Sequence, residues 1–541
     1  MTRAVGVRFN GGVSIAALRT LGTLAGLALL ASLAGAVWMG VLERGGPSHA
    51  DLVLPGGVPA TLTVPGGEGA LRDRALPGLG EGPPVMVLVH GYASDRAAMS
   101  VLARRVARNG YAVLTLDLRG HGENRGAFAP DPEGWAHVED LAAAVDWLRV
   151  SREVDGTRVA VAGHSMGAGA ALRFAERDAG LDAVILISGG GALRGPHHPP
   201  NVLLLWASGD PERTRVRGHE LASQLSGVGD VPLELGTTYG APDERHAARA
   251  DEIDGHDHST ILFAEAAAAE IVAWLDVTFD APRSGPPDLA APRLRAALLL
   301  GALLPFSMLG VGLLIGMLAP VWPPTPASPR GLLELAAALL LALPFVAVAP
   351  LGAFLGLDVV SVLAPLLFGG GLALLLGRAS GRGAPALPVL DGRPAGGVLR
   401  SLGAGAAGFA LVYALLAPLG VVLHHATPTP ARALLTVVLA GLLLPFFLGF
   451  ENALRGGGGL RALLQGAAGR AVALAAIVSG VALALVPRVV LLLLGPLVLV
   501  FLLAEIAGSV AWVRSHNRLA IAGFQSLFLA WLLALIMPLR L

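Results

Sequence analysis

The stretch VAVAGHSMGAG, residues 159–169, sets Ser165 between two glycines directly after an apolar run. The run is typical of a strand buried on both faces of a parallel sheet, and the residues from Met166 onward favour a helix. A serine at such a turn presents its hydroxyl above the sheet edge, and the glycines permit close backbone contact. The N–H of Met166 then lies at a helix N-terminus, where it can stabilise an oxyanion. The stretch therefore predicts an alternating strand-and-helix fold with a nucleophilic serine.

Further apolar runs in the same part of the chain indicate neighbouring strands. They occupy residues 83–91, 110–122, 181–190 and 201–210. The helix-like stretches between the runs are Asp95–Asn109, Glu133–Val150, Met166–Asp178 and Arg213–Leu225. Strands that alternate with helices predict an α/β fold, with a doubly wound, mostly parallel sheet. Right-handed crossovers bring the carboxyl ends of the strands to one edge, where the unusual residues gather.

A serine hydroxyl needs a base to take its proton and an acid to orient that base. Downstream of Ser165, LLLWASGDPE supplies Asp210 just past a buried strand, and Glu212 is the alternative acid. DGHDHSTIL supplies His258 on the loop before a helix, and His256 is the alternative base. The order Ser, Asp, His along the chain is the order expected on this fold.

Residues from about 50 to 278 resemble an α/β-hydrolase of the serine lipase and esterase type. The residues that carry the resemblance are His90–Gly91, DLRGHG (117–122), GHSMG (163–167), SGD (208–210) and DHSTIL (257–262). The resemblance implies that Ser165 is the nucleophile, His258 the base and Asp210 the group that orients the base. It also implies that the N–H groups of Tyr92 and Met166 form the oxyanion hole.

The other histidines of this region are interpreted as structural. We expect His90 and His121 to bond backbone groups in their loops, and His197–His198 to lie in a polar loop without binding a metal. The chain has no cysteine, which excludes thiol catalysis and cysteine-ligated metals. No cofactor is expected. Because only GGGALRGPHHPP (189–200) separates two strands where related enzymes often insert a cap, we expect an open cleft without a lid.

The whole chain is too apolar for an ordinary soluble protein, with 54% hydrophobic residues and a mean hydropathy of +0.66. Its formal net charge is zero, which gives no attraction for nucleic acid. The predicted parts are a cytoplasmic tail with an uncleaved anchor helix (1–42), the hydrolase-like domain (43–280), a Pro-rich linker (281–295) and an all-α membrane domain of about eight transmembrane helices (296–541). The membrane domain resembles no family that we identify.

Arginine in the short loops favours a cytoplasmic N-terminus. The arginines that then fall in cytoplasmic loops are Arg330, Arg378, Arg382, Arg393, Arg400, Arg455, Arg461, Arg470, Arg514 and Arg518. Arg293 and Arg295 argue against this orientation. The preferred orientation predicts an integral multi-pass protein of a bacterial-type plasma membrane, with the hydrolase-like domain outside the cytoplasm.

One carboxylate, Glu505, lies inside a predicted span, at a cost of ~2.5–3.5 kcal/mol on insertion scales. It is either a proton or substrate site or a packed polar contact with an arginine. We favour the packed contact, because no second acid is expected beside it. Glu334, Glu451 and His424–His425 lie near span ends, where they can reach interfacial water.

These patterns predict a membrane-bound serine hydrolase that cleaves an ester or thioester through an acyl-enzyme. The expected substrate is a small-molecule or lipid acyl compound, and membrane lipids are the expected surroundings. One alternative is an acyltransferase that uses the same triad. The other is a transport or sensor protein whose hydrolase-like domain only binds. The sequence leaves the substrate and the oligomeric state open.

Overall fold

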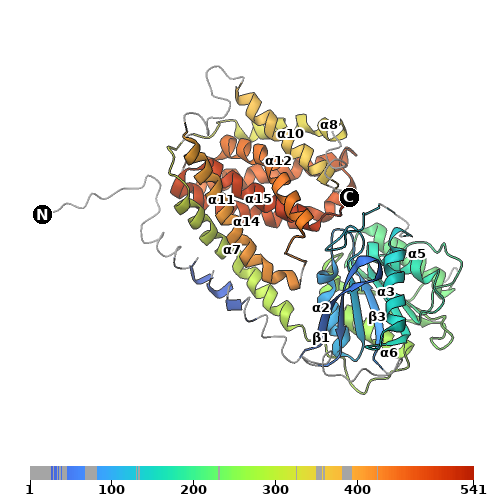
Figure 1. Cartoon of the computed structure of the whole chain (residues 1–541). Helices are drawn as coiled ribbons and strands as arrows, with labels where there is room; N and C mark the ends of the chain where they lie inside the picture. Colours follow the sequence, from blue (N-terminus) through green and yellow to red (C-terminus); the bar gives the residue numbers. More distant parts are fainter. Residues whose placement is uncertain are drawn as a thin grey trace. The chain divides into compact units, whose positions relative to one another are not determined.

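The structure is a computed structural model of residues 1–541. It describes scattered residues between 23 and 38 and the ranges 46–66, 82–129, 131, 135–228, 232–324, 326–348, 356, 360–379, 393–422, 424–457 and 459–540. Most of the predicted anchor helix, Thr20–Leu42, lies outside the described residues. Figure 1 shows a mixed sheet-and-helix part in blue to green and a helical part in yellow to red.

Contacts divide the chain into two compact units. The first, here called the sheet unit, comprises Trp38–Ala297 together with Leu419–His425 and Pro538–Leu541. The second, the helical unit, comprises Met1–Val37, Leu298–Pro418 and Ala426–Met537. The sheet unit thus includes two segments far along the chain that the sequence analysis did not assign to it. The predicted domain boundaries remain predictions.

A nine-stranded sheet forms the centre of the sheet unit, in the order β1-β2-β4-β3-β5-β6-β7-β9-β8. Its strands are β1 (Ser48–Leu54), β2 (Val58–Val64), β3 (Pro84–Val89), β4 (Ala112–Leu116), β5 (Asp155–His164), β6 (Ala183–Ile187), β7 (Val202–Gly209), β8 (Thr238–Tyr239) and β9 (Ala248–Asp257). The six strands from β4 to β9 in this order are parallel, and β1, β2 and β8 pair antiparallel at the two sides. The predicted mostly parallel sheet is confirmed.

Helices cover both faces of this sheet, and every residue of the central strands β3, β4 and β6 is therefore buried. One apolar core joins the sheet to α3 (Val138–Val150), α4 (Met166–Ala175) and α5 (Glu212–Ser226). A second core joins the opposite face to α2 (Ser100–Arg108) and α6 (Glu265–Thr278). The carboxyl ends of the parallel strands therefore meet at one sheet edge, between two layers of helices.

Eight helices make up the rest of the described chain. They are α7 (Pro292–Leu318), α8 (Gly331–Val348), α10 (Val360–Ala379), α11 (Ala395–Leu416), α12 (Pro430–Leu454), α13 (Gly459–Ala482), α14 (Leu494–Ser515) and α15 (Arg518–Ile536). Six are long and apolar enough to cross a membrane, and shorter apolar helices occupy Gly331–Pro344 and Leu363–Gly377. These helices occupy the predicted membrane domain, which fits a multi-pass membrane protein. The number of eight spans remains a prediction.

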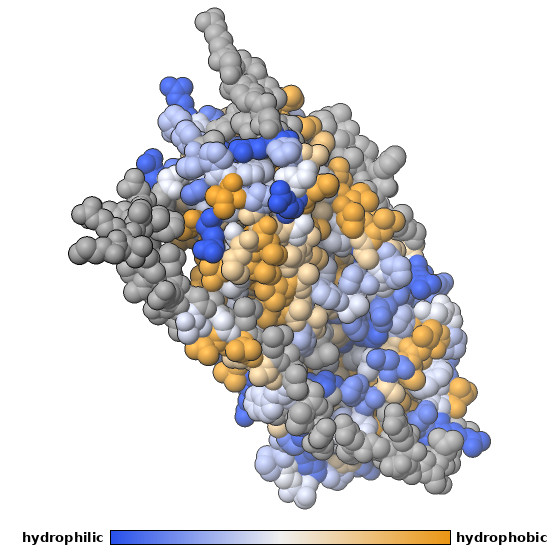
Figure 2. Space-filling model, turned by 60° about the vertical axis from the view of Figure 1, so that its left-hand side comes forward, coloured by the Kyte–Doolittle hydropathy of each residue, from blue (hydrophilic) through white to orange (hydrophobic). Residues whose placement is uncertain are grey.

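The helical unit exposes large apolar side chains, as lipid-facing helices do. Leu299, Leu333, Leu341, Val437 and Leu460 are each more than half exposed. Figure 2 shows apolar residues, in orange, gathered in patches on one face of the molecule.

The interior of the helical unit holds a buried set of charges, here called the Arg455 network. Arg455 donates to Glu451 (Nε to Oε2, 2.7 Å) and to Glu505 (Nη1 to Oε1, 2.6 Å), and Arg470 forms a second ion pair with Glu505. Ser509 also donates to Glu505, and Gln525 donates to Glu451. The network joins α12, α13, α14 and α15.

These contacts correct one expectation about the membrane domain. Glu451 does not reach interfacial water, since it is fully buried and shares Arg455 with Glu505. A second intramembrane acid therefore does accompany Glu505. The sequence places the two acids on different helices 54 positions apart, and only the packing of α12 against its neighbours brings them to one arginine.

Candidate active site

Ser165 occupies a sharp turn between β5 and α4. Its backbone has φ 54° and ψ −111°, and its N–H donates to the carbonyl of Ile187 at 2.9 Å. A Cβ on Gly163 would lie 2.2 Å from the carbonyl oxygen of Gly167, and a Cβ on Gly167 would lie 2.5 Å from that of His90. Both positions therefore require glycine, and the turn holds Ser165 in a backbone conformation that serine rarely adopts.

The structure brings Ser165, His258 and Asp210, here called the triad, into one chain of hydrogen bonds. His258 Nε2 lies 2.9 Å from Ser165 Oγ, and His258 Nδ1 lies 2.5 Å from Asp210 Oδ1. The hydroxyl can donate to Nε2 while Nδ1–H donates to the carboxylate, which is the arrangement a general base requires. The residues come from β5, the end of β7 and the loop after β9.

Asp210 is held as a carboxylate by three donors. Its side chain accepts hydrogen bonds from His258, from Ser188 Oγ at 2.6 Å and from the N–H of Ala207 at 2.8 Å. Burial by itself raises the pKa of Asp210, but the hydrogen bonds from His258, Ser188 and Ala207 outweigh it and hold the pKa below its usual value. The carboxylate can therefore orient the His258 ring and stabilise its charged form.

The loop that carries His258 is fixed on two sides. His164 donates from Nε2 to the carbonyl oxygen of His258 at 2.6 Å, and burial together with the nearby His258 lowers the pKa of His164 to about 3. Asp257 Oδ1 accepts from the N–H groups of Ser259 and Thr260. The sequence favours Ser259 as a helix cap, but its side chain makes no capping bond, and Asp257 organises the turn instead.

His164 is therefore a site residue that sequence reasoning did not single out. It lies inside the GHSMG motif, so its proximity to Ser165 was available from the sequence, but its bond to a loop 94 positions away was not. The alternatives lie elsewhere: Glu212 is exposed at the start of α5, and His256 is the next-to-last residue of β9. Among the described contacts, neither is hydrogen-bonded to Ser165.

Tyr92 and Met166 lie beside the nucleophile, where the oxyanion hole is predicted. Met166 is the first residue of α4. A Cβ on Gly91, which precedes Tyr92, would lie 3.1 Å from Ser165 Cβ. The Tyr92 ring packs edge-on against His121 and Phe128 at centroid distances of 6.0 and 5.7 Å. This placement is compatible with the prediction, and the role of the two N–H groups remains a prediction.

His90 and His121 bond backbone groups, as the sequence analysis expects. Leu118 N–H donates to His90 Nε2 at 3.0 Å, so Nδ1 carries the proton and donates to the Gly91 carbonyl at 2.7 Å. Burial lowers the pKa of His90, which keeps the ring neutral in this role. His121 Nδ1 lies 3.1 Å from the carbonyl oxygen of Arg119. His90 thus ties the loop after β3 to the loop after β4, next to Ser165.

The segment Leu419–His425 contributes to the same sheet edge within the sheet unit. The buried Asp95 accepts from the N–H of His425 through Oδ2 at 2.7 Å, and His424 Nδ1 lies 2.9 Å from the same oxygen. Although burial raises the pKa of Asp95, the charge of His424 and these bonds lower it well below its usual range. Asp95 lies three residues after Tyr92, so the segment supports the loop of the predicted oxyanion hole.

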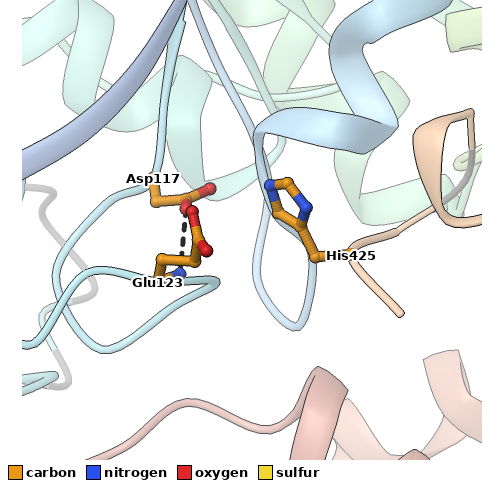
Figure 3. Close-up of side chains that lie close together, drawn as sticks. All are labelled: Asp117, Glu123 and His425. Carbon is orange, nitrogen blue, oxygen red and sulfur yellow. Dashed lines mark hydrogen bonds between the residues drawn. The ribbon is translucent and has the colours of Figure 1, made fainter. Parts of the chain in front are cut away.

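Figure 3 shows a second polar group near this segment, made by Asp117, Glu123 and His425. Their possible ligand atoms lie within 4.8 Å of one another. Arg96, however, forms ion pairs with both Asp117 and Glu123, and Glu123 N–H donates to Asp117 Oδ2 at 2.9 Å. A guanidinium therefore already compensates both carboxylates, and these residues are explained without a metal ion.

Comparison with known proteins finds similarity in this region. Residues 82–226 match the family model described as serine aminopeptidase, S33. An uncharacterized protein of Mycobacterium tuberculosis is 40% identical over 96 residues, 18% of this chain and 32% of the relative. Cutinase 2 of Thermobifida cellulosilytica is 34% identical over 101 residues, 18% of this chain and 35% of the cutinase. The chain thus spans about a third of the length of these relatives.

A solved puromycin-hydrolyzing peptidase of Mycobacterium tuberculosis superposes with a TM-score of 0.33 at 18% identity, covering 44% of this chain and 40% of that chain. A TM-score this low adds nothing to the fold assignment. The sheet topology and the family match over residues 82–226 together give the sheet unit an α/β-hydrolase fold, as the resemblance implies.

Proposed function

We propose that this protein is a membrane-bound serine hydrolase that cleaves carboxylic esters or thioesters through an acyl-enzyme. The observation that carries the proposal is the hydrogen-bonded chain from Ser165 Oγ through His258 to Asp210. The similarity of residues 82–226 to serine hydrolases and of a shorter stretch to cutinases supports the same class.

The triad geometry gives each residue a step. Ser165 Oγ attacks the acyl carbon while its proton passes to His258 Nε2, and Asp210 stabilises the imidazolium that forms. The N–H groups of Tyr92 and Met166 donate to the carbonyl oxygen as it becomes negative. The tetrahedral intermediate collapses, and the leaving alkoxide or thiolate takes the proton from His258. A water molecule, deprotonated by His258, then attacks the acyl-enzyme, releases the acid and restores Ser165.

The absence of a cap element supports access by a bulky or membrane-bound substrate. Residues 188–201, all described, form no helix or strand between β6 and β7. The arginine distribution of the loops favours a hydrolase domain outside the cytoplasm. We therefore propose acyl lipids or other acyl esters at the outer membrane face as substrates.

The test uses the full chain in a neutral detergent. Ser165 should react with a fluorophosphonate probe, and the protein should turn over p-nitrophenyl esters with a preference that depends on acyl length. Ser165→Ala should abolish both signals. Absence of labelling in folded protein would instead favour the non-catalytic binding domain.

The same preparation separates hydrolysis from its close alternatives. An added alcohol acceptor that becomes acylated in preference to water would indicate an acyltransferase. Turnover of aminoacyl anilides but not esters would indicate a peptidase, the activity named in the matched family description.

A further inference from the structure

A polar pocket opens in the sheet unit, beside the triad but outside it. Its volume is about 420 Å³, in the range of small-molecule sites. One wall is the loop after β6, formed by Gly190, Gly191, Ala192 and Arg194, and the opposite wall is one side of α5, from Arg213 to Gln224. Arg173 of α4, the helix that begins at the nucleophile, completes the lining.

Both walls start from residues that contact the triad. Ser188 donates to Asp210, and a Cβ on Gly189 would lie 2.4 Å from the carbonyl oxygen of Ser165, so the loop leaves the triad and enters the pocket within two residues. The other wall follows Asp210 directly, since α5 begins at Glu212. Both walls of the pocket are therefore continuous in the chain with residues that contact the triad.

The loop wall is a built feature. Arg173 and Glu176 form a fully buried ion pair, and Arg173 also donates to the carbonyl of Ala192. Glu176 Oε1 accepts from the N–H groups of Arg194 and Gly195 at 2.5 and 2.8 Å. Through these hydrogen bonds the buried Arg173–Glu176 pair fixes the loop as one wall of the pocket.

The lining is strongly cationic. It contains four arginines and one carboxylate, Glu220. Arg173 is compensated by Glu176, but Arg213 and Arg217 form no ion pair with any described residue, and both are exposed, as is Arg194. The two guanidiniums of Arg213 and Arg217 facing one carboxylate leave a net positive pocket, and guanidinium groups bind carboxylates and phosphates in a bidentate manner.

We propose that this pocket binds an anionic group, a carboxylate or a phosphate, carried by the ester substrate. The inference rests on the proposed hydrolase function and narrows its substrate class. Arg213 and Arg217, one turn apart on α5, are the specificity-determining residues, and Arg194 closes the site from the loop.

The experiment compares two soluble esters of equal length on the full chain in neutral detergent: p-nitrophenyl butyrate and mono-p-nitrophenyl succinate. The wild-type protein should prefer the succinate ester, and higher ionic strength should raise its KM. The double variant Arg213→Ala/Arg217→Ala should lose about tenfold or more in kcat/KM for the succinate ester, mainly through KM, because charge-assisted hydrogen bonds are lost. Turnover of the butyrate ester should stay within about twofold.

Arg152→Ala is the matched control, because Arg152 is an exposed arginine just before β5, at the opposite edge of the sheet from Ser165. It should leave both esters unchanged. A second measurement needs no turnover: a phosphonate probe with a carboxylate tail should label Ser165 faster than its neutral analogue, and the double variant should remove that difference.

A lipid arm distinguishes the source of the anion. Vesicles of phosphatidylglycerol and of phosphatidylcholine are offered to the same variants. Loss on the succinate ester and on phosphatidylglycerol would assign the pocket to headgroup phosphates as well, whereas loss on the succinate ester alone would assign it to soluble anionic esters. A loss of turnover by the double variant on vesicles alone would indicate general attraction to a charged surface. That result would overturn the proposed anion-binding pocket.

Failure of this inference differs from failure of the proposed function. Normal fluorophosphonate labelling without any charge preference would remove the anionic subsite and leave the serine hydrolase. Absent labelling of folded protein would remove both.

Discussion

The sheet unit and the helical unit each bury a set of hydrogen-bonded charged groups, and the two sets are built in opposite ways. The triad is a linear chain of hydrogen bonds that ends at Ser165, which is partly exposed. The Arg455 network is closed: every carboxylate oxygen of Glu451 and Glu505 accepts at least one hydrogen bond from a partner that is itself buried.

The kinds of ions differ as well. The triad contains an imidazole, a group that can act as a base and then as an acid. The network balances its acids with guanidiniums, which do not lose their protons in proteins. The triad, which contains an imidazole and ends at an accessible hydroxyl, has the groups that proton transfer requires. The Arg455 network, which contains only permanent charges with buried partners, is suited to holding helices together. Four variants test this contrast.

The largest effect is expected from breaking the triad at its acid. Asp210→Asn cannot hold the His258 ring in the required tautomer, so kcat for an ester should fall by about 10⁴-fold. Steady-state turnover of full-length protein measures this. Glu212→Gln, which changes the alternative acid, should be neutral, and the triad assignment fails if the two variants exchange their effects.

Breaking the Arg455 network should cost stability and leave the chemistry alone. Arg455→Met leaves the buried Glu451 without an ion-pair partner and Glu505 with Arg470 alone, with an expected loss of ~3–5 kcal/mol in the free energy of unfolding. Thermal melts and size-exclusion profiles in detergent report it, and turnover per probe-labelled molecule should be unchanged. Arg461→Met, at an exposed position, is the control. An unchanged melting temperature of Arg455→Met would contradict a stabilising role for the Arg455 network.

The pH dependence of stability sharpens the contrast through His164. Its folded pKa of about 3 lies below the unfolded value of 6.5, so the unfolded chain binds more protons in this window. Stability is therefore full above pH 6.5 and falls towards pH 3, by up to about 1.4 kcal/mol per pH unit.

His164→Gln keeps a donor for the His258 carbonyl. It should reduce the difference in the free energy of unfolding between pH 6.5 and pH 5 by about 2 kcal/mol. Denaturant titrations at the two pH values provide the measurement. His246→Gln, at an exposed histidine, should leave the slope as in the wild type. Equal slopes for all three proteins would mean that His164 titrates freely.

The smallest effect concerns the strained backbone of Ser165. Ser165→Gly and Ser165→Ala should be equally inactive, but the glycine variant should be about 1 kcal/mol more stable, because only glycine adopts a positive φ without strain. A difference in melting temperature between the two variants checks this. Identical melts would indicate that the turn carries no strain.

The sequence was sufficient for the parts of the site that depend on local pattern. Ser165 follows from a strand, two glycines and a helix, and Asp210 and His258 follow from strand ends and chain order. The antiparallel hairpin of β1 and β2 was missed because its strands alternate without a long apolar run, and β9 was missed because ARADEIDGHD is charged.

The contacts that escaped prediction all join residues far apart in the chain. His164 reaches a loop 94 positions away, Asp95 meets His425 across 330 positions, and Glu451 meets Glu505 through Arg455. No periodicity or motif encodes such pairs, because they arise only when complete elements pack. Sequence pattern therefore located Ser165, Asp210 and His258, which the structure joins by hydrogen bonds, better than the residues that hold them in place.

The inclusion of Leu419–His425 and Pro538–Leu541 in the sheet unit has a consequence for biosynthesis. The strands and their helices leave the ribosome early and can fold as translation proceeds, at about 5–20 residues per second. The partners of Asp95 emerge only after several later helices have been made, so the nascent chain spends some seconds with that carboxylate unpaired by His425. Completion of this contact is therefore timed by synthesis of the helices that precede His425.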